Sequence, residues 1–172
     1  STKGKGRAFY AVTVSVNGVE NLSDFSPANS LAAPVAEVPG EWRPVVQPAG
    51  KEFGFDYRGK RTYYVRWVDE PLAPRPMYFN WSVLVPSGKG SKPVELYFHG
   101  PGESYARPPV KFLDRSIQIC PHDFPPSGWY GYNDALSAGE PAEKGVVSNH
   151  TQRRIMAFLD WLAEAYPVDR ER

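Results

Sequence analysis

The sequence is poor in several features that define whole classes of protein. Cys120 is the only cysteine among 172 residues, so the chain has no internal disulfide and no zinc site built from thiolates. No apolar run approaches the roughly 20 residues that a membrane helix needs. The formal net charge is only +1. A chain this close to neutral is not expected to bind nucleic acid or an anionic membrane through broad electrostatic attraction.

The composition favours a globular, β-rich protein. Hydrophobic residues make up 41% of the chain and charged residues 23%, which provides enough apolar material for a core. The 18 prolines and the aromatic content of 14% favour strands joined by long ordered loops over a helical bundle. Cys120 follows an apolar run and is expected to be a buried, unreactive thiol.

The first 40 residues have the pattern of strands. Tyr10, Val12, Val14 and Val16 alternate with smaller or polar residues, which predicts a half-buried strand over residues 8–17. Asn17-Gly18 then predicts a turn. A second extended run covers residues 29–38. Because two strands are not stable alone, we interpret this segment as the end of a β-sandwich.

The order Tyr-Ala-Val-Thr-Val, Asn-Gly-Val-Glu, Ser-Pro-Ala-Asn-Ser resembles the last two strands of a fibronectin type III domain, over about residues 8–38. The resemblance implies a spacer or adhesion module in a secreted multidomain protein, hence an extracellular or periplasmic location in a bacterium. The expected organisation is a fibronectin-like remnant at 1–39, a linker at 40–59 and a second domain at 60–172.

The second domain alternates strands with one clear helix. Aromatic or apolar runs predict strands at 61–69, 77–85, 94–98 and 116–120, followed by a long loop over 121–147. An apolar stripe at helical spacing predicts a helix over 150–166, with Asn149 as its N-cap and Gln152 completing a capping box. The predicted fold class is therefore α/β: a mixed sheet with one crossover helix, cut short after it.

The end of the 94–98 strand carries the most specific chemical signal. His99-Gly100-Pro101-Gly102 follows it directly, and a glycine turn at the end of a buried strand suits the stabilisation of an oxyanion by backbone N–H groups. Pro101 has no N–H, so the donor is expected to be Gly102 or Glu103, with Gly100 allowing close approach. The sequence contains no Gly-x-Ser-x-Gly, and Ser104 is rejected as a nucleophile because the required glycine is missing after it.

Residues 60–172 resemble the front half of an α/β-hydrolase, of the esterase and polyhydroxybutyrate-depolymerase-like branch. The resemblance rests on His99-Gly100 and on the helix end Tyr-Pro-Val-Asp-Arg-Glu-Arg at 166–172. It implies a serine, an acid and a histidine beyond Arg172, so this polypeptide alone is expected to be inactive. It also implies an ester substrate, possibly a polyester or a cell-wall polymer, with no cofactor and no metal.

The histidines fit no complete triad. His99 is expected to brace the glycine turn by hydrogen bonding rather than act as a base. His122-Asp123 suggests either a fragment of a metal site or dyad, or a structural pair, and the structural pair is favoured because adjacent loop residues point different ways. His150 is expected to be an ordinary surface residue.

The aromatic loop at 127–134 is the candidate for substrate contact. Trp129, Tyr130 and Tyr132 lie beside glycines after the end of a strand, where open α/β sheets bind ligands. The other interpretation is that these rings pack the loop down, and the sequence leaves both open, as it does the oligomeric state.

A second hypothesis for the whole chain is a non-catalytic, β-rich module that binds carbohydrate or protein. The amphipathic helix counts against it. The two hypotheses differ in one structural respect: a hydrolase needs strands 94–98 and 116–120 to be parallel neighbours with the helix on one face, whereas an all-antiparallel sheet would exclude it.

Overall fold

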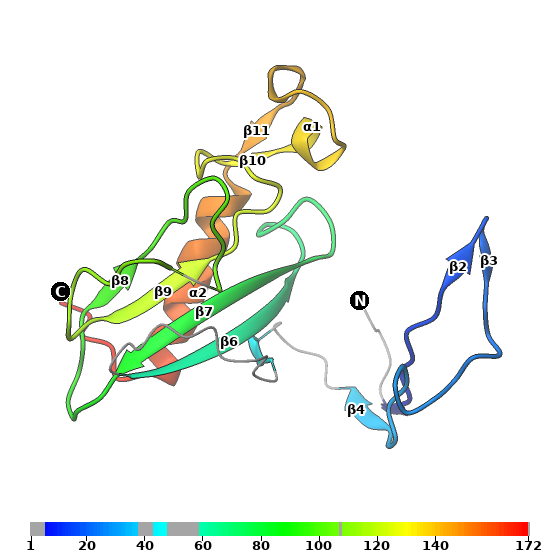
Figure 1. The fold of residues 1–172 in the computed structure, drawn as a ribbon, viewed down its shortest axis with the longest axis horizontal. Coiled ribbons are helices and arrows are strands. Elements are labelled where there is room, and N and C mark those ends of the chain that lie inside the picture. Colours follow the sequence, from blue (N-terminus) through cyan, green and yellow to red (C-terminus); the bar gives the residue numbers. More distant parts are fainter. Residues whose placement is uncertain (1–5, 38–42, 48–58, 107, 172) are drawn as a thin grey trace. The chain divides into compact units, whose positions relative to one another are not determined.

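The structure is a computed structural model that describes residues 6–37, 43–47, 59–106 and 108–171. The chain divides into two compact units, Ser1–Glu41 and Trp42–Arg172, and each is described by itself (Figure 1). Among the described residues, no helix is both long and apolar enough to cross a lipid bilayer.

Unit 1 is an irregular β-hairpin. β1 (Gly6–Ala8) pairs antiparallel with β4 (Val35–Glu37), and β2 (Ser15–Val16) pairs with β3 (Val19–Glu20). Asn17 and Gly18 join β2 to β3 with φ angles of 51° and 78°, as a type I′ turn requires. The turn predicted at Asn17-Gly18 is confirmed.

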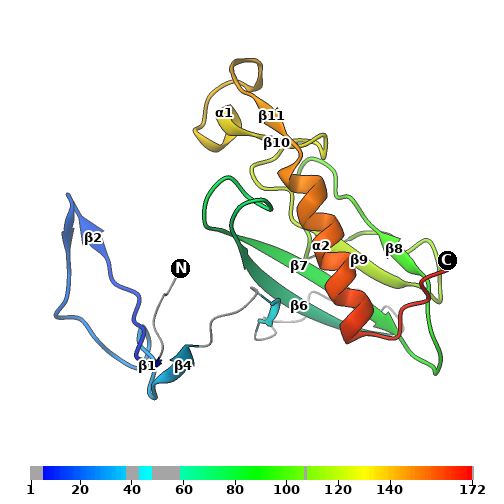
Figure 2. The same cartoon turned by 180° about the vertical axis from the view of Figure 1, so that it is seen from behind.

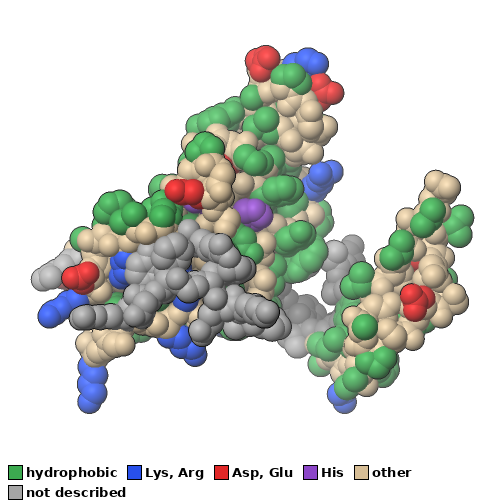
Figure 3. Space-filling model, in the orientation of Figure 1, with side chains coloured by type: hydrophobic (Ala, Val, Ile, Leu, Met, Phe, Trp, Pro, Cys, Tyr) green, Lys and Arg blue, Asp and Glu red, His purple; other side chains and the backbone are tan. Residues whose placement is uncertain are grey.

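The burial predicted for residues 8–17 is wrong. Regular pairing covers only the two ends of this run, with an isolated bridge between Ala11 and Ser30. The alternating side chains stay exposed, at 76% for Val12 and 67% for Val14. The reason is that no second layer covers them within the described part of unit 1, where hydrophobic side chains lie along the surface (Figure 3).

Unit 2 is built on a five-stranded sheet in the order β5-β6-β7-β9-β8 (Figure 1). Its strands are β5 (Val45–Val46), β6 (Gly59–Val68), β7 (Met77–Pro86), β8 (Val94–Leu96) and β9 (Ile117–Pro121). Neighbouring strands are antiparallel except β8 and β9, which are parallel. The structure is therefore mixed α/β, and the four predicted strands and the parallel pair are confirmed. β5 comes from the segment that the sequence predicts as a linker.

The helix α2 (His150–Ala165) covers one face of this sheet (Figure 2). Phe158 stacks on Trp81, with ring centroids 3.9 Å apart and planes 7° apart, and both rings are almost fully buried. Large aromatic rings removed from water dominate the energy of a core, so this pair anchors the helix, and the helix predicted over 150–166 is confirmed. The buried cluster consists of Tyr64, Trp81, Val83, Ile117, Ile119, Ile155, Phe158 and Leu162.

The capping box predicted at the start of α2 is not formed. Asn149 occupies the N-cap position, but its side chain makes no capping hydrogen bond. Gln152 instead donates from Nε2 to the carbonyl oxygen of Trp129, at 3.1 Å. The predicted capping residue therefore ties the helix to the aromatic loop.

The other face of the sheet carries a buried polar cluster centred on Glu95. Glu95 and Gln118 alternate along their strands with the apolar residues that face α2, so their side chains point away from the helix. Arg61 extends the cluster by donating to Gln118 Oε1 at 3.2 Å and to Ser82 Oγ at 3.0 Å. The donors to the Glu95 carboxylate, at 2.7–3.3 Å, are Lys111 Nζ, Phe112 N–H, Leu113 N–H, Ser116 Oγ and Gln118 Nε2.

The segment 121–147, predicted as a loop, contains short regular elements. These are β10 (Tyr132–Asn133), α1 (Asp134–Ser137), a 3-10 turn at Ala142–Lys144 and β11 (Val147–Ser148), which pairs antiparallel with β10. Asn133 organises them, because its side chain accepts the N–H groups of Ala135 and Leu136 and donates to Ala142 O at 2.9 Å. An asparagine N-cap of this kind is the signal that the sequence carried for α1.

After α2 the chain returns to the sheet beside β8. Val168 forms a parallel bridge with Lys92, in which the Lys92 N–H donates to Pro167 O and the Asp169 N–H donates to Lys92 O, both at 2.8 Å. The backbone of Pro93 bonds instead to β9. Since successive residues of a strand bond to opposite sides, the returning chain lies on the edge of β8 away from β9.

Candidate functional site

The candidate site lies where the parallel strands β8 and β9 end. His99 follows β8, and His122 and Asp123 follow β9. Parallel strands bring their carboxyl ends to the same edge of a sheet, where open α/β sheets bind ligands. The two chain segments are joined directly, because the Asp123 N–H donates to His99 Nε2 at 3.3 Å. The bracing role predicted for His99 agrees with this bond.

Residues 100–103 form a tight turn after His99. The Glu103 N–H donates to Gly100 O at 3.1 Å, and Gly102 has a φ of 80°. Proline followed by a glycine of positive φ is the sequence of a type II turn. The Glu103 N–H, one of the two predicted oxyanion donors, is thus engaged within the turn, whereas the Gly102 N–H has no hydrogen-bond partner among the described residues.

The carboxylate of Glu103 folds back over the same turn. Its Oε2 atom accepts the Gly100 N–H at 2.9 Å and the Tyr97 hydroxyl at 3.0 Å. Sequence reasoning missed both contacts, because it considered only the backbone of Glu103. The acidic residue three positions after the glycine was the available signal.

Trp129 holds the turn from the other side. Its indole Nε1–H donates to His99 O at 2.9 Å, and its ring lies 4.8 Å from that of Phe98 and 5.1 Å from that of His99. Trp129 has a φ of 71°, in the left-handed region that bulky residues rarely adopt. Such backbone strain persists only where the surrounding structure imposes it, and it concentrates at functional sites.

The other two predicted aromatic contacts differ in exposure. Tyr130 is 54% exposed beside Trp129, whereas Tyr132 is 4% exposed and directs its ring edge toward His150, with centroids 5.9 Å apart. Phe98, at 46% exposed, was not predicted but joins Trp129 at the surface. The exposed aromatic surface at this end of the sheet therefore consists of Phe98, Trp129 and Tyr130.

Asp123 is a buried structural residue. Its carboxylate accepts the N–H and hydroxyl of Ser127 at 2.8 and 2.9 Å and the N–H of Gly128 at 2.9 Å. These bonds fold the loop back so that Trp129 reaches His99. The structural interpretation of Asp123 is confirmed.

His122 is kept neutral by its surroundings. Burial lowers its pKa, and the nearby positive charges of His99 and Arg154 lower it further against the opposing effect of Asp123. Its ring lies between those of Tyr105 and Phe124, with centroids at 5.2 and 5.6 Å. A neutral imidazole packed among rings acts here as a filler of the site's floor.

Other candidate chemistry is limited. No group of three metal-ligating side chains occurs among the described residues. Burial raises the pKa of the Cys120 thiol to about 12, which leaves it protonated and unreactive. His150 is not a plain surface residue, since its Nδ1 lies 2.9 Å from Pro71 O and so ties α2 to the turn between β6 and β7.

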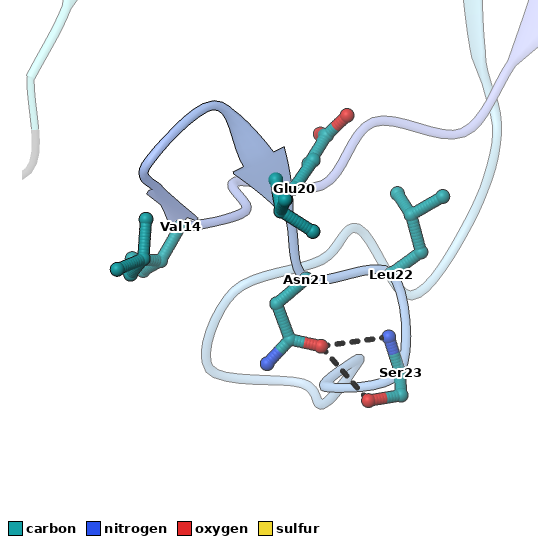
Figure 4. A pocket seen from close by; sticks show the side chains of 7 residues that line it. Val14, Glu20, Asn21, Leu22 and Ser23 are labelled. Carbon is teal, nitrogen blue, oxygen red and sulfur yellow. Dashed lines mark hydrogen bonds between the residues drawn. The ribbon is translucent and has the colours of Figure 1, made fainter.

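A hollow of about 660 Å³ lies on unit 1, lined by Val14, Val16, Val19, Glu20, Asn21, Leu22 and Ser23 (Figure 4). Asn21 Oδ1 accepts the N–H and hydroxyl of Ser23 at its rim. Its walls are mainly aliphatic, and it offers no nucleophile paired with a base, so the candidate chemistry stays with the turn on unit 2.

In comparisons with known proteins, no family model, no curated protein and no solved structure matches the chain significantly.

Proposed function

We propose that residues 60–172 are the N-terminal portion of the catalytic domain of a serine carboxylic-ester hydrolase of the α/β-hydrolase type. In this proposal the nucleophile, acid and histidine come from residues beyond Arg172, and residues 99–103 form the oxyanion turn. Unit 1 is the remnant of a fibronectin type III-like module in a secreted protein, located in the extracellular or periplasmic space.

The observation that carries the proposal is the path of the chain around β8. β8 runs parallel to β9, α2 crosses one face of the sheet, and Val168 then enters the sheet parallel to Lys92 on the free edge of β8. A strand continuing in this direction would end beside the turn at His99. In α/β-hydrolases the serine stands on the sharp turn from a strand to a helix, and one oxyanion donor comes from the loop after the third strand. Counted from β6, β8 is the third.

The aromatic surface supports a large substrate. Phe98 and Tyr130 are about half exposed, next to the turn that is proposed to bind the reacting ester. An open surface of rings suits an ester carried on a polymer chain, such as a polyester or a cell-wall polymer, better than a small molecule that needs an enclosed pocket.

A non-catalytic module that binds carbohydrate or protein is the second candidate. It is favoured by one observation: the N–H groups of Gly100 and Glu103 are both already hydrogen-bonded inside the turn. The same aromatic surface would then be the binding face.

The sequence encoded after Arg172 separates the two candidates. A strand ending in Gly-x-Ser-x-Gly within about twenty residues supports the esterase, and the protein extended through it should be labelled on that serine by a fluorophosphonate and should hydrolyse p-nitrophenyl butyrate. The 172-residue chain should do neither. A stop codon or a further β-sandwich pattern after Arg172 would contradict the esterase and leave the binding module.

A further inference from the structure

Two hydrogen-bond donors converge on a single oxygen atom at the end of β8. The Gly100 N–H and the Tyr97 hydroxyl lie 2.9 and 3.0 Å from Glu103 Oε2. An oxyanion site is defined by donors 2.7–3.1 Å from the position that the charged oxygen occupies. The carboxylate oxygen of Glu103, itself negatively charged, thus sits where such an oxygen would be held.

Both donors are held in place independently of Glu103. The Tyr97 N–H donates to Ile119 O at 2.8 Å, which extends the pairing of β8 with β9 and fixes the backbone of Tyr97. The peptide group that joins His99 to Gly100 is fixed by the bond from the Trp129 indole to its carbonyl oxygen. Donors fixed in this way need no rearrangement when their acceptor changes, which is what makes such a site effective.

Glu103, in contrast, is free to move. It is exposed, and among the described residues it takes part in no ion pair. Its side chain can leave the donors for water without opening the core. A ligand oxygen of the same charge can then replace it, because bonds from neutral donors to a charged oxygen are stronger than those to a neutral one.

We propose that the Gly100 N–H and the Tyr97 hydroxyl form an anionic-oxygen site, and that Glu103 occupies it as an internal substitute that a ligand displaces. The ligands are carboxylates and, resting on the proposed function, the tetrahedral intermediate of an ester, whose carbonyl oxygen receives the electron pair of the C=O bond when a nucleophile bonds to the carbon. This site differs from the donors expected at Gly102 or Glu103, and it makes Glu103 an inhibitory residue.

Titration of the 172-residue chain with sodium butyrate, followed by amide and aromatic NMR, tests the site without requiring turnover. In Glu103→Ala, saturable shifts are expected for the Gly100 amide and the Tyr97 ring, with butyrate bound about tenfold or more tightly than by the wild-type chain. Sodium chloride at equal concentration is the control for ionic strength. Glu164→Ala, on the exposed side of α2, is the matched control and should bind butyrate as the wild type does.

A second pair of variants covers the case in which Glu103→Ala disturbs the turn. Glu103→Gln keeps the side-chain carbonyl as an acceptor but removes its charge, so it should also bind butyrate more tightly than the wild type. Adding Tyr97→Phe to either variant should weaken binding about threefold to tenfold by removing one donor. Equal affinity in the wild type and both Glu103 variants, or no effect of Tyr97→Phe, would overturn the proposal. Since butyrate binding is read without catalysis, these outcomes are independent of whether a serine elbow follows Arg172.

Discussion

Replacing Glu95 with glutamine removes the carboxylate at the centre of the polar cluster on the sheet face opposite α2. The carboxylate accepts hydrogen bonds from five donors. Glutamine has almost the same shape, but it presents an NH₂ group to some of these donors and carries no charge. The substitution therefore tests how much the charge itself contributes.

The magnitude follows from the pKa of Glu95. Burial alone would raise it, but hydrogen bonds from Phe112, Ser116, Leu113 and Gln118 lower it from 4.5 to about 2. A lowering of this size corresponds to about 3 kcal/mol of folding free energy at neutral pH. Because the pKa is lower in the folded state, this contribution is complete above pH 4.5 and is lost as the pH falls toward 2.

Urea unfolding of the wild type and of Glu95→Gln across a pH series provides the measurement. The difference in unfolding free energy should be largest near neutral pH and should shrink by about 2 kcal/mol by pH 3. Glu164→Gln, on the exposed side of α2, should track the wild type throughout. A difference that does not change with pH would show that Glu95 titrates normally in the folded protein and would refute the reasoning.

Three further predictions concern the core, one loop and the thiol. Phe158→Ala should lower the unfolding free energy by about 3–5 kcal/mol in urea titrations, whereas Met156→Ala, 59% exposed on the same helix, should change it by less than about 0.5; similar values for the two would contradict the stacking role. Gly131→Ala places a Cβ 2.8 Å from a β11 carbonyl oxygen, and should lower the melting temperature more than Gly139→Ala, whose Cβ meets nothing within 4 Å. Cys120 should react with a disulfide reagent only after unfolding in urea, and fast labelling of the native protein would show that it is accessible.

The sheet of unit 2 was predictable because its signals are local. Apolar and aromatic runs bounded by proline or glycine mark β6, β7, β8 and β9, and the helical stripe of α2 implies a crossover, hence the parallel pair. The burial of unit 1 was not predictable in the same way. Alternation in a strand reports that one face is apolar, but not that another layer covers it, and Val12 and Val14 remain exposed.

The candidate site was predictable only in part. The His99-Gly100 turn is contiguous in sequence, so its position and shape could be anticipated. The contacts that define its chemistry are not: Trp129 bonds to His99 across 30 positions, and Lys111 reaches Glu95 across 16. Such side-chain contacts depend on how loops return over the sheet, which no local pattern encodes.

The left-handed backbone of Trp129 sets stability against performance at this site. A bulky residue in that region costs about 1–3 kcal/mol, and glycine would relieve most of that cost. Trp129→Gly would also remove the indole that secures the peptide group of His99 and Gly100. A search for more heat-resistant variants should therefore select glycine here while lowering the protein's ability to hold an anionic oxygen, and retaining tryptophan is worthwhile only if that ability is needed.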